Sequence, residues 1–85
     1  MLRMTPLAQL LEAALFASGG PASLEMLAAL EPDATKEELQ NALQELRHHY
    51  DEGGHSIELV EAAGGWQLLT RPEYTSAIER AQLAA

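Results

Sequence analysis

The stretch from Thr35 to Tyr50, TKEELQNALQELRHHY, limits the possible folds more than any other part of this chain. Thr35 and Glu38 have the spacing of a capping box, in which the threonine caps the N–H of Glu38 and the glutamate reaches back to Thr35. A helix is therefore predicted to begin here. Apolar residues then recur every three or four positions, and such a stripe must face a core. These residues are Leu39, Ala42, Leu43, Leu46 and Tyr50.

The opposite side of this predicted helix is polar and slightly acidic, with Lys36 and Arg47 as its only fixed positive charges. The helix follows a shorter predicted helix and precedes a predicted β-hairpin, which is the element order of a winged helix-turn-helix. In DNA-binding proteins of that kind the corresponding helix often enters the major groove, where Arg and Lys neutralise phosphates and Arg, Asn or Gln reach base edges. This helix has the shape for that role without the charge.

Two further helices are predicted before the central one. Pro6 at a first-turn position starts a helix through about Ser18, which Gly19 and Gly20 end. Ser23 caps a second helix from Leu24 to about Leu30, and Pro32 places a turn before the central helix. The first helix carries one apolar face, formed by Leu7, Leu10, Leu11, Ala14 and Leu15.

A β-hairpin is predicted after the central helix, which Gly53 and Gly54 end. The segments Ser56 to Ala62 and Trp66 to Thr70 are rich in β-formers, and Gly64-Gly65 between them suits a type I′ turn. That turn would bring two pairs of residues together, Val60 opposite Leu69 and Glu58 near Arg71. A turn centred on Ala63-Gly64 would shift this register.

Pro72 allows a last helix over roughly Glu73 to Leu83. Its apolar positions occupy one side, and they are Tyr74, Ala77, Ile78 and Ala81. The chain stops in Ala-Gln-Leu-Ala-Ala without Gly, Pro or a charged tail, which indicates a piece of a longer protein. The predicted fold is mainly α with a β-hairpin: a winged helix-turn-helix of three helices, a two-stranded wing and a C-terminal helix, in one domain over residues 1–85.

The formal charge of −8 opposes unassisted binding to nucleic acid or to an anionic membrane, because clustered Lys and Arg supply most of the affinity for either. The chain has no cysteine, which excludes disulfides and thiolate metal sites. No apolar run approaches the roughly 20 residues of a membrane span, and no signal peptide opens the chain. We expect a soluble, cytoplasmic protein without membrane contact.

No pattern of catalytic or ligand-binding residues stands out. His48, His49 and His55 could form a metal site, but adjacent helical residues point about 100° apart and no partner at ligand spacing supports them. The glycine pairs lack the pattern of a phosphate loop, and none of the serines lies in a nucleophile elbow. We therefore predict no catalytic, cofactor-binding or metal-binding residues, no cofactor and no enzymatic activity.

Two segments resemble a known family. Residues 11–27 read LEAALFASGGPASLEML and residues 57–74 read IELVEAAGGWQLLTRPEY. Both are similar, at matching spacings, to the N-terminal domain of the segregation and condensation protein B (ScpB) family, which shares the Leu-Glu-Ala-x-Leu-Phe-x-Ser-Gly opening and the Gly-Gly-aromatic-x-Leu-x-Thr-Arg-Pro-Glu-Tyr hairpin end. One departure is Gly20, where the family often has Glu or another polar residue, and it touches only a loop.

The resemblance implies a winged-helix domain that is the first of two in a bacterial ScpB. It further implies a homodimer formed through this domain, binding to the kleisin subunit ScpA, and association through ScpA with the Smc ATPase in a condensin-like complex that compacts and segregates chromosomes. No catalysis is implied for this subunit. DNA is implied to contact mainly the assembled complex, so this chain would be nucleoid-associated only indirectly.

Interface residues are expected among the apolar side chains left over once the core is assigned. These candidates are Phe16, Met26, Val60, Trp66 and Leu69, whereas Leu11, Leu15, Leu59 and Leu68 are assigned to the core. Phe16 falls on the far side of its helix from Leu7 and Leu10, and we expect a neighbouring element such as the hairpin to pack on it, with a partner protein as the alternative. A lone Trp is more often a core residue than an interface residue. The last helix covering the candidates is the remaining alternative.

The sequence thus favours a non-catalytic winged-helix module for dimerisation and kleisin binding in chromosome segregation. The alternative is a DNA-binding transcriptional regulator of the same fold, and a third possibility is a metal module built on the three histidines.

Overall fold

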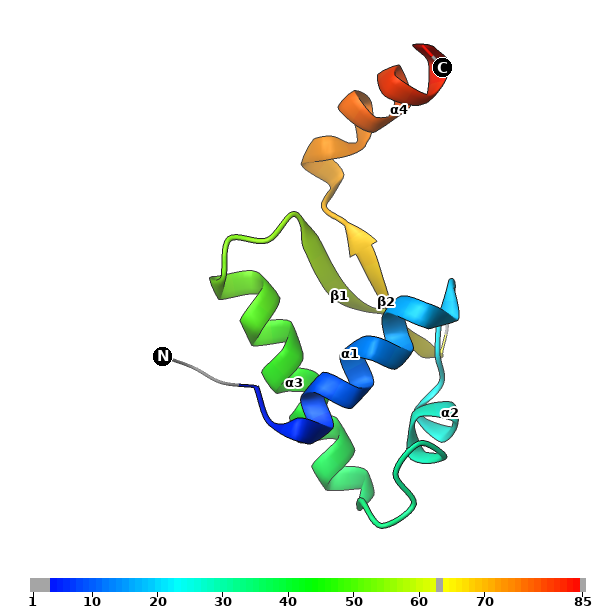
Figure 1. The fold of residues 1–85 in the computed structure, drawn as a ribbon, viewed down its shortest axis with the longest axis vertical. Helices are drawn as coiled ribbons and strands as arrows, with labels where there is room; N and C mark the ends of the chain where they lie inside the picture. Colours follow the sequence, from blue (N-terminus) through cyan, green and yellow to red (C-terminus); the bar gives the residue numbers. More distant parts are fainter. Residues whose placement is uncertain (1–3, 63, 85) are drawn as a thin grey trace.

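The computed structural model describes residues 4–62 and 64–84 of the chain. The elements follow in the order α1 (Pro6–Ser18), α2 (Leu24–Ala28), α3 (Lys36–Glu52), β1 (Ile57–Ala62), β2 (Gly65–Thr70), a 3₁₀ helix η1 (Pro72–Tyr74) and α4 (Thr75–Ala84). The first three helices and the hairpin share one core, and α4 extends away from them (Figure 1). The predicted fold class, a mainly helical winged helix with a two-stranded wing and a C-terminal helix, is confirmed.

Side-chain caps set the starts of the helices. Thr35 accepts from the N–H of Glu38 at 3.0 Å and Glu38 Oε1 accepts from the N–H of Thr35 at 2.9 Å, so the predicted capping box is present. Ser23 caps α2 as predicted by accepting from the N–H of Met26. These local bonds satisfy N–H groups that the first helical turn leaves without intrahelical partners.

Two of the predicted helix ends differ from the structure. α2 was predicted to reach about Leu30 but ends at Ala28, because the backbone tightens there and the N–H of Leu30 bonds to the carbonyl of Leu27 at 3.1 Å. α3 continues past Tyr50 to Glu52 and ends at Gly53. A side chain at that glycine would place Cβ 2.7 Å from the carbonyl oxygen of His49, so only glycine fits without a shift.

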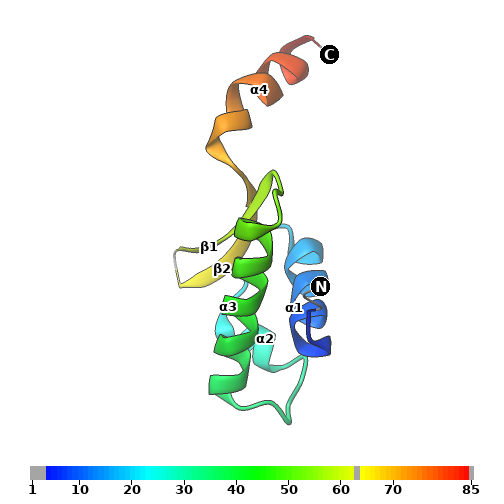
Figure 2. The same cartoon turned by 90° about the vertical axis from the view of Figure 1, so that its left-hand side faces the viewer.

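The core lies where the inner faces of α1 and α3 meet the inner face of the hairpin (Figure 2). Leu11, Leu43 and Leu46 are fully buried, and Leu10 stands at the edge with 38% exposure. The predicted stripe of α3 is buried along its whole length. The complete core consists of Ala8, Leu11, Leu15, Ala22, Leu27, Leu39, Ala42, Leu43, Leu46, Tyr50, Leu59 and Trp66.

The hairpin register differs from the one expected for a Gly64-Gly65 turn. Val60 lies opposite Gln67 rather than Leu69, and Ala62 pairs with Gly65. This is the register of the alternative turn centred on Ala63-Gly64, although Ala63 itself lies outside the described residues. The prediction that Val60 faces Leu69 is therefore wrong.

A close approach of the backbone explains why residue 65, the first of β2, is glycine. The backbone of Ala22, in the α1–α2 connection, exchanges two hydrogen bonds of 2.8 Å with Trp66. A Cβ on Gly65 would lie 3.0 Å from the carbonyl oxygen of Ala22. Glycine at this position therefore allows the backbone of the α1–α2 connection to pair with β2 at the edge of the wing. Gly64, with φ of +76°, supplies the left-handed conformation before β2.

α4 stands off the rest of the molecule (Figures 1 and 2). The principal extents are 47 × 30 × 18 Å and the radius of gyration is 14.2 Å, whereas a compact domain of this length would have about 12 Å. From Thr75 to Gln82 every side chain is exposed except that of Ile78, which is half-buried. Within the described residues, no helix is both long and apolar enough to cross a membrane.

Candidate interaction surface

One of the two fixed positive charges on α3 is used in contacts within the molecule. The Nε of Arg47 donates to the carbonyl oxygen of Leu59 at 3.3 Å, and its guanidinium lies 5.4 Å from the centre of the Trp66 ring. These contacts join α3 to both strands of the wing. Lys36, at the start of the helix, is the other cation and is exposed. A helix with this charge distribution is poorly equipped to neutralise phosphates.

Three of the five interface candidates are exposed apolar side chains. Phe16 is 79% exposed, Met26 57% and Leu69 41%. Val60 is half-buried, and Trp66 is 7% exposed and belongs to the core. Exposed large apolar side chains are the usual sign of a contact with another molecule when they gather on one surface.

The expectation that Phe16 packs within the molecule is wrong. The hairpin packs against the face of α1 that carries Leu11 and Leu15, with Leu68 on its inner side, and leaves Phe16 uncovered. The alternative in which the last helix covers the candidates is also wrong, because α4 points away from the body (Figure 1). Phe16 therefore remains available to a partner.

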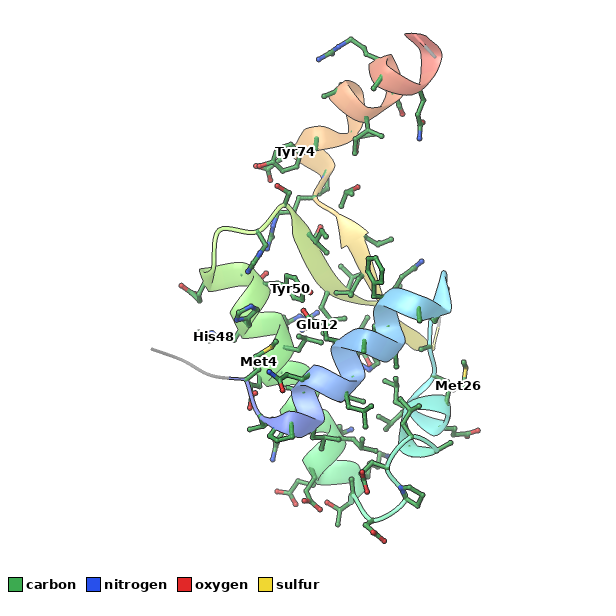
Figure 3. All side chains as sticks on the ribbon, viewed as in Figure 1. Met4, Glu12, Met26, His48, Tyr50 and Tyr74 are labelled. Atoms are coloured by element: carbon green, nitrogen blue, oxygen red, sulfur yellow. The ribbon has the colours of Figure 1, made fainter. Side chains whose placement is uncertain are left out.

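The register determines which candidates share a surface. Leu59 and Leu68 are paired and face the core, so Val60 and Leu69 point to the opposite, outer face of the wing. Met26 lies apart from them, on the outer side of α2 (Figure 3). The structure thus groups Val60 with Leu69 and separates Met26 from both.

A polar contact inside the domain joins α1 to α3. The hydroxyl of Tyr50 donates to Oε2 of Glu12, and the two side chains meet between the helices (Figure 3). Burial raises the pKa of Tyr50 to about 12, with further contributions from the hydrogen bond and from the negative charge of Glu12. At neutral pH Tyr50 therefore keeps its proton. Its hydrogen bond to Glu12 holds the two helices together and does not transfer a proton.

Arg71 is the polar centre of the junction between α3, the wing and α4. Its Nε donates to the carbonyl of His55 at 2.8 Å, and its Nη2 donates to the carbonyl of Tyr50 at 2.9 Å and to Oδ1 of Asp51 at 3.1 Å. The expected proximity of Glu58 is confirmed by a 4.0 Å ion pair with Nη1. Sequence reasoning missed the contacts of Arg71 with the end of α3 and with His55, because these partners lie 16 to 21 positions away in the sequence.

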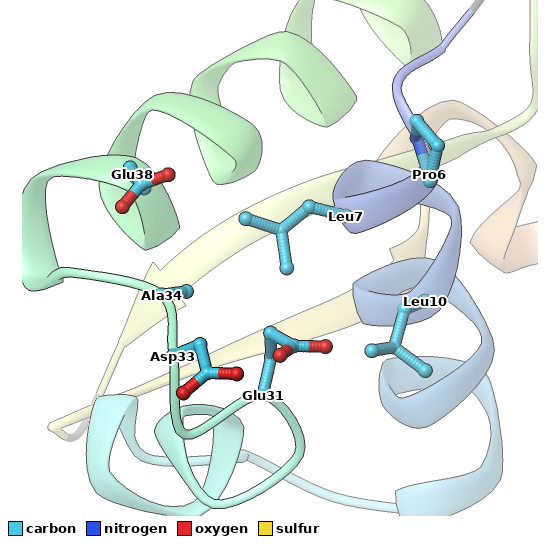
Figure 4. Close-up of a pocket in the computed structure, with 7 residues that line it drawn as sticks. All are labelled: Pro6, Leu7, Leu10, Glu31, Asp33, Ala34 and Glu38. Atoms are coloured by element: carbon cyan, nitrogen blue, oxygen red, sulfur yellow. The ribbon is translucent and has the colours of Figure 1, made fainter.

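A shallow hollow of about 430 Å³ lies between the start of α1 and the loop that precedes α3 (Figure 4). Leu7, Leu10 and Ala34 give it an apolar floor, and Glu31 and Asp33 stand at its rim. Glu38 also lines it, but its carboxylate already accepts the N–H of Thr35. Bonds from the backbone and hydroxyl of Thr35 lower the pKa of Glu38, so this group acts as a helix cap.

The histidines do not gather into a metal site. His48 points outward from α3 (Figure 3), while the rings of His49 and His55 lie 5.1 Å apart. In the part of the chain that the structure describes, no three side chains of His, Asp or Glu are placed to hold one ion. His49 and His55 instead pack beside Tyr50, with ring centres 5.7 and 5.1 Å from it.

Comparisons with known proteins point to one family. The family model described as "Segregation and condensation complex subunit ScpB" matches residues 9–84. A protein named Segregation and condensation protein B from Syntrophotalea carbinolica is 44% identical over 71 residues, covering 84% of this chain and 36% of that protein. One of the same name from Moorella thermoacetica is 40% identical over 72 residues, covering 81% and 35%. The chain spans about a third of the length of these curated relatives.

Solved structures agree with this match. A crystal structure of a dimer of the ScpB N-terminal domain complexed with ScpA peptide has a TM-score of 0.81 and 28% identity, covering 89% of this chain and 94% of that chain. The structure of ScpB from Mycobacterium tuberculosis has a TM-score of 0.83 at 24% identity, covering 99% and 52%, and supports the fold alone.

Proposed function

The chain belongs to the ScpB family, and on that premise we propose that it is a non-catalytic scaffold domain of a bacterial segregation and condensation complex. In this proposal it pairs with a second copy of itself and binds the kleisin ScpA, and through ScpA it joins the Smc ATPase. It is the first, winged-helix domain of a longer two-domain subunit. It works in the cytoplasm at the nucleoid, and DNA contacts the assembled complex rather than this domain.

The single observation that carries this proposal is the similarity to a dimer of the ScpB N-terminal domain complexed with ScpA peptide. That similarity covers 89% of this chain and 94% of the other, at a TM-score of 0.81. The similarity extends over almost the whole of both chains. The domain that forms a dimer and binds ScpA peptide in that structure is therefore the domain that this chain resembles.

The chemistry of the surface supports contact with protein. Phe16, Met26 and Leu69 expose apolar area, as expected of side chains that a partner covers. The net charge of −8 and the commitment of Arg47 to Leu59 argue against the alternative, a DNA-binding regulator.

Two measurements test the proposal. Sedimentation equilibrium of the chain should give a dimer mass, and isothermal titration calorimetry with a peptide from the ScpA of the same organism should give saturable binding. A monomer at every concentration would contradict the pairing, and an absence of heat with that peptide would contradict kleisin binding by this domain.

The DNA-binding alternative has its own test in fluorescence anisotropy with a labelled duplex. We expect no binding at about 150 mM salt, where phosphate contacts are weakened by counterion release. Duplex binding that persists at that salt and weakens in Lys36→Ala would favour the regulator. Lys36 is the better variant for this test because Arg47 also holds the wing in place.

A further inference from the structure

α4 is the helix that packs least against the rest of the molecule. It is a helix of 10 residues, and isolated helices shorter than about 12–15 residues are marginal in water. Its side chains from Thr75 to Gln82 are exposed or, for Ile78, half-buried. Tyr74 and Ile78 are four positions apart and therefore share one side of the helical segment, together with Ala77 and Ala81. A helix of this kind needs a second surface that covers its apolar side.

The exposed area of the monomer indicates how much surface a partner would cover. The chain exposes 5944 Å², about 1,000 Å² more than the roughly 4,900 Å² that a compact monomer of this mass would expose. One partner in an interface of standard size buries about 800 Å². The surplus therefore has the magnitude of one side of a stable protein–protein interface.

The body of the same molecule carries a surface of matching chemistry. Phe16 on α1 is 79% exposed. The hairpin packs on the face of α1 that carries Leu11 and Leu15 and leaves the side with Phe16 uncovered, and we call this side the Phe16 surface. Because α4 leads away from the body (Figures 1 and 2), it does not cover Phe16 of its own chain.

Both halves of the contact, the apolar side of α4 and the Phe16 surface, are thus present on one chain. Two copies related by a two-fold axis can each supply a helix and receive one, which closes the assembly at two. We propose that the dimer forms by this reciprocal exchange, with α4 of each copy packed on the Phe16 surface of the other. This inference rests on the pairing proposed above and names the contact that produces it.

Charge sets a condition on this contact. Two copies that each carry −8 repel one another, so the attraction has to come from apolar burial. Between residues 75 and 82, α4 carries one acid and one base, Glu79 and Arg80, and brings no net charge to the contact. Added salt screens the repulsion, so we expect the dimer to hold or tighten between about 50 and 500 mM NaCl, whereas a contact with a basic partner would weaken.

The first experiment is sedimentation equilibrium of the 85-residue chain and two charge variants. Ile78→Asp alters the apolar side of α4 and Phe16→Asp alters the receiving surface, and both sites lie outside the core. We expect each variant to raise the dimer dissociation constant at least tenfold. Ser76→Asp, on the opposite side of α4, and Ala17→Asp, one residue past Phe16 and exposed, add the same charge and should leave the constant within about threefold.

Mixing the two variants separates exchange from like-with-like pairing. In an exchanged dimer of Phe16→Asp with Ile78→Asp, the intact α4 of the first chain meets the intact Phe16 surface of the second. One of the two contacts is then complete, so the mixture should dimerise more strongly than either variant alone. If α4 packed on α4 and Phe16 on Phe16, neither contact would be intact and mixing would restore nothing.

The outcomes separate this inference from the proposed function. A wild-type dimer that both variants leave unchanged would overturn the exchange and keep the pairing. Variants that each weaken the dimer without recovery on mixing would also overturn the exchange. A wild-type chain that stays monomeric at every concentration would overturn both, and would assign the apolar side of α4 to another occupant, such as a further segment of a longer protein.

Discussion

The hydrogen bond between Tyr50 and Glu12 gives the most quantitative prediction, because it can be removed without changing the shape of the core. Tyr50 is 8% exposed, and Tyr50→Phe keeps its ring while deleting the hydroxyl that donates to Glu12. A hydrogen bond to a charged acceptor contributes about 1.5–3 kcal/mol. Glu12 is half-buried and can be solvated when it loses the donor, so we expect a loss of about 1–2 kcal/mol in the free energy of unfolding at pH 8.

The same pair predicts how this loss changes with pH. The pKa of Tyr50 is about 12 in the folded state and about 10 in an unfolded chain. Because the folded state holds the proton more tightly, this stabilisation is complete below pH 10 and is lost as the pH rises toward 12. Two pKa units correspond to about 3 kcal/mol. Phe has no proton to lose, so the advantage of the wild type should shrink above pH 10 and vanish or reverse near pH 12.

Urea unfolding followed by far-UV circular dichroism at pH 8, 10 and 11.5 measures this difference. Comparing the two proteins at the same pH cancels the titration of every other group. Tyr74→Phe is the matched control, because Tyr74 is 41% exposed and we expect a change of less than about 0.5 kcal/mol at pH 8. A difference between wild type and Tyr50→Phe that stays constant from pH 8 to pH 11.5 would refute the argument.

Three further changes test single contacts by the same unfolding assay. Arg71→Lys should cost about 1–3 kcal/mol, because an ammonium cannot reproduce the donors that reach three acceptors at once; a cost near zero would contradict its role at the junction. Gly65→Ala should cost about 1–3 kcal/mol through its approach to the Ala22 carbonyl, whereas Gly20→Ala meets nothing within 4 Å and should be nearly neutral. Thr35→Ala should cost about 1 kcal/mol by removing the cap of α3, and an unchanged unfolding midpoint would argue against the cap.

The helices were predictable because their signals are local. Caps at Ser23 and Thr35 and the apolar stripe of α3 each depend on residues within a few positions of one another, and the structure keeps all three. The hairpin register was not predictable in the same way. Both Gly64-Gly65 and Ala63-Gly64 make acceptable turns, and the observed register also includes the pairing of Trp66 with Ala22, a contact that is far away in sequence.

The candidate surface was only partly predictable, because exposure depends on packing between distant elements. Phe16 was expected to be covered since a hairpin was expected nearby, yet the hairpin packs only on the inner face of α1. The position of α4 could not be read from its periodicity, since an apolar stripe of Tyr74, Ala77, Ile78 and Ala81 predicts that something covers the helix but not whether it belongs to the same molecule. Trp66, by contrast, lies in the core as a lone Trp usually does.

The distribution of charge explains how a fold shaped for a DNA groove is suited to protein contact. The chain has five basic residues against thirteen acidic ones, and two of the five, Arg47 and Arg71, point inward to hold the wing against α3. The cations that a DNA-binding winged helix would present outward are thus used to fix the hairpin. What the domain offers to other molecules is negative charge, which disfavours polyanions, and the few apolar side chains that its own core leaves uncovered. Association is then decided by burial of those side chains rather than by attraction to phosphates.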